Sequence, residues 1–306
     1  MARYNSRLIT PPAEEEEIYP YRRVWPSLTF EISILFAVVL VIYLLTRFVN
    51  IPTQLYQPIN VVLALVPMGL WLAFSWWRER SAVQPRSNLV TLALVTGLVA
   101  QAIATPFIQD IIQPERWLSI ESAINRIVGY TFTVGIVQAI SIYLVMRYTV
   151  SSDQYRVRLD GVAYGIASAV GYATVANLQY ALAAPVAPSN AAMHLFNQVA
   201  ILMCNAIIIG YGLSEVIMNS RPFPLILAAA IGLSAFVTGV ALPLIAGFTN
   251  AGLSVEFPIS SASPIRGFLF AAGLLFVLAN VFSFLFNVAD RQEAELRIEE
   301  TESLST

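Results

Sequence analysis

Eight long apolar runs constrain this chain more than any other feature of its sequence. Each is about twenty residues long, which is the length that a helix needs to cross a hydrocarbon core of about 30 Å. Inside a bilayer the backbone polar groups must be satisfied within the chain, so such runs fold as helices. The expected spans are 28–46, 59–77, 88–108, 127–147, 160–183, 194–217, 223–247 and 265–288.

Composition supports the same class. Charged residues make up 12% of the chain and hydrophobic residues 57%, whereas a soluble domain carries about 25% charged residues. We therefore expect an all-α, polytopic integral membrane protein with a cytoplasmic N-terminal tail over 1–27, a membrane domain over 28–289 and an acidic cytoplasmic tail over 290–306. The net charge of −2 and the lack of a basic cluster argue against nucleic acid as a partner, and membrane lipid is the expected surrounding.

The distribution of arginine predicts the orientation. All seventeen basic residues are arginines, and an even number of spans places both termini on one side. Thirteen arginines fall on that side, and four fall on the other, namely Arg47, Arg116, Arg126 and Arg266. Because arginine is enriched in cytoplasmic loops, both termini are expected in the cytoplasm.

The connection between the third and fourth spans mixes apolar and charged residues. Residues 109–126 contain Pro114 near their start, followed by Trp117 and Glu121. This pattern predicts a short amphipathic helix lying in the external interface, with a re-entrant loop as the alternative.

The fifth span presents a row of small residues. Gly161, Gly165, Ala169 and Ala173 recur every fourth residue, so they lie close to one helix face. Small residues at this spacing let neighbouring backbones approach closely. We expect this face to be a tight helix–helix interface.

Polar side chains lie inside the spans. Gln138 is in the fourth span, Asn177 in the fifth, and His194, Gln198 and Asn205 follow one face of the sixth. One interpretation is that they form interhelical hydrogen bonds, and the other is that they line a polar functional cavity.

The supply of metal ligands is small. The chain has one histidine and one cysteine, whereas a hydrolytic zinc site needs about three His, Glu, Asp or Cys ligands and a water. Asp160 and Glu215 are expected near the cytoplasmic interface, where water solvates them. The sequence therefore predicts neither a bound metal nor another cofactor.

Three blocks of residues carry a family resemblance. They are Asp160, Gly161, Tyr164 and Gly165; then Gly171, Tyr172, Ala173, Thr174 and Asn177; then Gly210 and Tyr211. In order and spacing, residues 135–213 resemble the core of the PrsW-type intramembrane proteases, which are related to the prenyl-protein (CAAX) endoproteases. The resemblance implies a metal-dependent peptidase fold with a family-like core over 127–217.

The reactive positions of the family pattern do not match. The resemblance places a Glu-Glu pair on Gln138 and Ala139, and a Lys on Ile142. It places a further Glu on Ala176 and a His on Leu202. A carboxamide such as Gln138 holds hydrogen bonds but does not act as a base near neutral pH.

The sequence therefore favours a bacterial inner-membrane pseudoprotease without catalytic residues, which binds or scaffolds a membrane-protein partner or a transmembrane peptide. The binding candidates are Gln138, Asn177, Asn205, Asp160 and Tyr164. One alternative is an active intramembrane metalloprotease with unrecognised ligands. Another is a transporter or an accessory subunit of a membrane complex, although a mid-depth charge and paired broken helices, which are typical of transporters, are missing.

Overall fold

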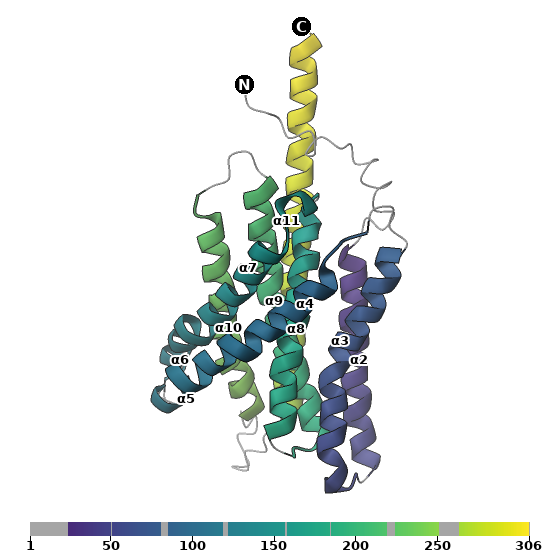
Figure 1. The fold of residues 1–306 in the computed structure, drawn as a ribbon, viewed down its shortest axis with the longest axis vertical. Coiled ribbons are helices and arrows are strands. Elements are labelled where there is room, and N and C mark those ends of the chain that lie inside the picture. Colours follow the sequence, from purple (N-terminus) through teal and green to yellow (C-terminus); the bar gives the residue numbers. More distant parts are fainter. Residues whose placement is uncertain are drawn as a thin grey trace, which may run out of the picture.

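The computed structural model is a helical bundle whose long helices coincide with the eight expected runs (Figure 1). It describes residues 24–49, 51–80, 85–118, 122–156, 158–183, 185–218, 224–250 and 263–305. Residues 1–23, most of the expected N-terminal tail, lie outside the described residues. Six helical stretches are long and apolar enough to cross a membrane, namely Thr53–Arg80, Leu89–Trp117, Ala123–Thr149, Pro188–Met218, Ile226–Thr249 and Pro264–Leu285. The protein is therefore an all-α, multi-pass membrane protein.

Two of the eight expected runs fall short of this length and apolarity. Helix α2 (Val24–Phe48) has a shorter apolar part, Ile32–Thr46. Helix α8 (Arg158–Ala183) is not among the six stretches. Much of α8 is covered by other helices, so its surface does not have to be as apolar as one that faces lipid.

The helices follow one another through short connections. The first half comprises α3 (Tyr56–Arg80), α4 (Leu89–Val99), the π-helical segments η3 (Ala100–Ala104) and η4 (Phe107–Ile112), and α5 (Pro114–Trp117). The second half comprises α6 (Ala123–Tyr130), the π-helical η5 (Thr131–Gly135), α7 (Ile136–Thr149), α8, α9 (Pro188–Met218), α10 (Ile226–Asn250) and α11 (Pro264–Ser305). Short 3₁₀ turns, η2 (Thr53–Leu55) and η6 (Ser152–Gln154), precede α3 and α8.

The short helix expected within 109–126 is present as α5, but it has only four residues. The third span continues through η4 until Gln113, which adopts a left-handed conformation with φ of 47° and ends it. Pro114 then starts a helix of only four residues. The Ser122 side chain accepts a hydrogen bond from the Asn125 backbone N–H and caps α6, so the fourth span begins at Ala123.

The expected tight interface of the fifth span is confirmed. A Cβ atom on Gly165 would collide with the carbonyl oxygen of Ala206, and one on Gly161 would collide with Gly210 and Ser214. The small face of α8 therefore packs directly on the backbone of α9. Because α9 also packs against α2, α3, α7, α10 and α11, these two helices form the centre of the bundle.

Helix α11 extends well past the bundle (Figure 1). It has 42 residues, a length of about 63 Å, of which Pro264–Leu285 is the apolar part. The acidic segment from residue 290 thus continues the last span as a helix up to Ser305. The start of α2 and the end of α11 lie at the same end of the bundle (Figure 1), as an even number of crossings requires.

Candidate functional site

The five binding candidates are all inside the bundle. Gln138 is 5% exposed, and Asn177, Asn205, Asp160 and Tyr164 are at most 1% exposed. They come from α7, α8 and α9. The structure therefore places them within the packed helices rather than on an open surface.

Gln138 lies one turn after the π-helical segment η5. Its side chain approaches the hydroxyl group of Tyr172 on α8, and its Oε1 atom has no hydrogen-bond partner among the described residues. At the end of η5, a Cβ atom on Gly135 would collide with the backbone of Ala235, so α7 is held close to α10. Gln138 thus sits where α7 meets α8, with an acceptor oxygen unused.

Asn177 and Asn205 form contacts between helices. Asn177 Nδ2 donates to the Leu195 carbonyl at 3.4 Å, and Asn205 Nδ2 donates to Thr238 Oγ1 at 2.7 Å. The interpretation of these two residues as interhelical hydrogen bonds is confirmed. Each Oδ1 atom is buried and has no partner in the part of the chain that the structure describes.

Asp160 is the centre of a buried ionic network, so the expectation that water solvates it was wrong. Its side chain is 0% exposed and accepts hydrogen bonds from Arg86 Nε at 2.7 Å and from the Arg156 backbone N–H at 2.9 Å. Arg86 also pairs with Glu79 at 2.9 Å. Partners on both sides offset the cost of burying these charges. The network joins the end of α3, the segment before α4 and the start of α8.

Glu215 was also wrongly expected to be solvated. It is 7% exposed and accepts a hydrogen bond from Arg158 Nε at 2.6 Å. Ser214 Oγ donates to the Arg158 carbonyl at 3.0 Å, so α9 holds the start of α8 through two neighbouring residues. Beside them, burial raises the pKa of the Tyr155 hydroxyl, with Tyr164 acting in the same direction. Tyr155 is therefore neutral at physiological pH.

Sequence reasoning missed Arg86 as a site residue. It counted this arginine only as part of the charge on one side of the membrane. The available signal was its position: Arg86 lies a few residues before the apolar run of α4, and it is the last arginine before Arg116. A basic residue so close to a span needs either water or an acidic partner, and Asp160 at the start of α8 provides that partner.

The positions that the resemblance equates with reactive groups are filled by packed side chains. Ala139, Ile142 and Leu202 are 0% exposed and belong to one hydrophobic core cluster, and Ala176 packs against it half-buried. Among the described residues, no three His, Cys, Asp or Glu side chains are grouped so that they could hold a metal ion. These residues do not fit the zinc site that the resemblance implies.

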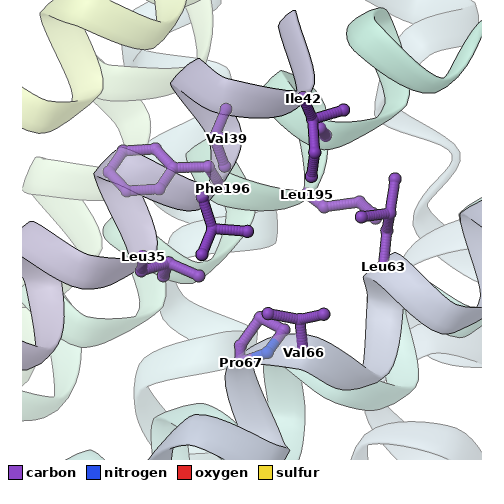
Figure 2. A pocket seen from close by; sticks show the side chains of 10 residues that line it. Leu35, Val39, Ile42, Leu63, Val66, Pro67, Leu195 and Phe196 are labelled. Atoms are coloured by element: carbon purple, nitrogen blue, oxygen red, sulfur yellow. The ribbon is translucent and has the colours of Figure 1, made fainter. Parts of the chain in front are cut away.

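A hollow between α2, α3 and α9 lies apart from these positions. It is lined by apolar side chains, among them Val39, Leu63 and Phe196 (Figure 2). None of the five binding candidates lines it. The hollow is therefore apolar, and its lining offers no hydrogen-bonding side chain.

The helical membrane fold, together with a family match, identifies the chain as an intramembrane protease-like membrane protein. A sequence model of the PrsW family intramembrane metalloproteases matches residues 84–242, just over half of the chain. The chain belongs to this family. The match begins just before Arg86 and ends in α10, so it includes Arg86 and Asp160 of the ionic network as well as α8 and α9. No curated protein and no solved structure matches the chain.

Proposed function

We propose that this PrsW-family protein is a pseudoprotease that binds or scaffolds transmembrane segments of a partner membrane protein. The observation that carries the proposal is the filling of the reactive positions. Two aliphatic side chains, Ala139 and Leu202, are completely buried where the family pattern has Glu and His. A hydrolytic metal site needs lone-pair donors at such positions, and a packed aliphatic core supplies none.

What remains is a rigid pair of central helices with neutral polar groups. Gln138, Asn177 and Asn205 each keep a buried amide oxygen without a partner among the described residues. Unused acceptors inside a membrane protein are costly, so they favour a role in contacting another group. Asp160 and Tyr164 support the same scaffold at the end where α8 begins.

A second candidate is an active metalloprotease that uses other ligands. Membership of a metalloprotease family favours it. In that case the ligands come from residues outside the pattern that the resemblance supplies. Zinc content and peptide cleavage separate the two functions.

The test is metal analysis of the purified full chain in nanodiscs at neutral pH, combined with a single-turnover cleavage assay on a transmembrane peptide. We expect well below one equivalent of zinc and no cleavage. About one equivalent of zinc, together with cleavage of the peptide, would establish the active metalloprotease instead. The combined variant Gln138→Glu, Ala139→Glu, Ala176→Glu and Leu202→His should gain weak zinc binding that the native chain lacks.

We further propose that the protein lies in a bacterial inner membrane with both termini in the cytoplasm. The thirteen-to-four distribution of arginines supports this orientation. Reporter fusions to residue 1 and to residue 306 test it. External labelling of either terminus would contradict the orientation.

A further inference from the structure

The two central helices expose a polar surface near the connection that joins α8 to α9. Tyr180 on α8 stacks on His194 on α9, with ring centroids 3.9 Å apart. Since α8 and α9 are antiparallel, Ala176, one turn before Tyr180, lies level with Gln198, one turn after His194. These four residues, Ala176, Tyr180, His194 and Gln198, form the α8–α9 strip. His194 is exposed and the other three are half-buried.

The strip contains hydrogen-bonding groups that the bundle leaves unused. The Gln198 amide and the His194 ring nitrogens make no hydrogen bond with the described part of the chain. This distinguishes them from the amides of Gln101 and Gln179, which bond to each other at 2.7 Å, and from Asn280, which bonds to the Phe276 carbonyl. Gln198 therefore presents both a donor and an acceptor to whatever covers the strip.

The depth of Gln198 in the membrane indicates which kind of molecule binds the α8–α9 strip. Gln198 lies ten residues after Pro188, the first residue of α9, and four residues inside the expected span 194–217, which is about 6 Å into the hydrocarbon core. Hydrocarbon tails offer no hydrogen-bond partner at this depth, so a free amide there is costly. The strip bears no carboxylate, lysine or arginine, and the small Ala176 side chain allows another backbone to approach Gln198. A transmembrane helix with a neutral polar side chain matches these features of the strip.

We propose that the α8–α9 strip is the docking surface for a partner transmembrane helix that carries a neutral hydrogen-bonding side chain, such as Gln, Asn or Ser, opposite Gln198. The proposal rests on the proposed function, because it specifies where and how that function binds its partner. The strip is where a second helix first reaches the bundle, because the five buried candidates lie inside the packed helices α7, α8 and α9.

The test uses two designed single-span peptides of leucine and alanine, one with a glutamine at the depth of Gln198 and one with leucine there. Each peptide is labelled, and its binding to the full chain in nanodiscs is measured by energy transfer. We expect the native chain to prefer the glutamine peptide by about threefold to tenfold, the range that interhelical hydrogen bonds support. Gln198→Leu should abolish this preference, and His194→Phe, which retains a ring to stack on Tyr180, should weaken it. Asn280→Leu removes an exposed amide that is already bonded, so it should keep the native preference.

The outcomes separate the two proposals. Equal binding of both peptides would overturn the role of the strip and leave the proposed function standing, whereas no binding of either peptide would overturn both. A second copy of the chain is the competing occupant. It is tested with Gln198→Cys in a Cys204→Ala background, and efficient disulfide cross-linking between copies without peptide would show that the strip is a self-association surface and overturn the proposal.

Discussion

The two halves of α8 differ in how completely the bundle covers them. Every residue from Asp160 to Thr174 is buried, whereas between Val175 and Ala183 only Asn177 and Ala181 are. The first half is held by ionic pairs and by glycines that touch the backbone of α9. The second half is held by single hydrogen bonds and a ring stack. One half therefore maintains the architecture, and the other is available for contact.

This difference bears on the proposed pseudoprotease, because the two halves differ in which positions of the family pattern they contain. The residues that match the family pattern best, such as Asp160, Gly161 and Gly165, are in the first half, where they have packing and ionic roles. Ala176, which the resemblance equates with a reactive Glu, is in the second half. Most of the matching residues of α8 thus lie in its covered half.

The largest expected effect is the loss of the Asp160 carboxylate. Asp160→Leu leaves Arg86 buried beside a hydrocarbon side chain, and breaking a buried ion pair in this way costs about 3–5 kcal/mol. The variant should unfold at markedly lower denaturant in a dodecyl sulfate titration. Asp153→Leu is the matched control, because Asp153 is exposed and should change stability little. Adding Arg86→Met to Asp160→Leu should restore part of the loss, and a double variant as unstable as the single one would contradict the assignment.

A smaller effect is expected at the helix–helix contact of the same half. Gly165→Leu must push α9 away from α8, because even a Cβ atom collides with the Ala206 carbonyl. Overpacking of this kind costs about 1–3 kcal/mol. Gly69→Leu provides the comparison, since no atom lies within 4 Å of a Cβ placed there. Equal thermal stability of the two variants in detergent would show that the small face is not a packing constraint.

The next effect in size concerns a single interhelical hydrogen bond. Asn205→Leu removes the bond to Thr238, and such bonds contribute about 0.6 kcal/mol on average and up to about 1.7 kcal/mol. A loss in this range is expected from the same titration, with Asn280→Leu as a control that leaves the bundle interior intact. A loss of several kcal/mol would indicate that Asn205 belongs to a larger network.

Sequence reasoning predicted the parts of this structure that depend on local patterns. The runs of apolar residues indicated the helices, and the four-residue spacing of Gly161 and Gly165 indicated the contact with α9. It did not predict the ion pairs of Asp160 and Glu215, because a position near a helix end does not show whether an arginine from elsewhere in the chain pairs with it. Pro114 indicates that the third helix ends nearby, but the left-handed conformation of Gln113 is not one that its residue type predicts.

The smallest expected effect tests the second half of α8 directly. Ala176 and Ala173 lie on the same helix, but Ala173 is 0% exposed and Ala176 is half-buried. Ala173→Leu has no room and should cost about 1–3 kcal/mol, whereas Ala176→Leu can direct its side chain toward lipid and should stay within about 0.5 kcal/mol of the native stability. Because Ala176→Leu also covers Gln198, it should reduce binding of the glutamine peptide while leaving the fold intact. Equal destabilisation by the two variants would mean that both halves of α8 are packed alike, and the division into an architectural half and a contact half would be lost.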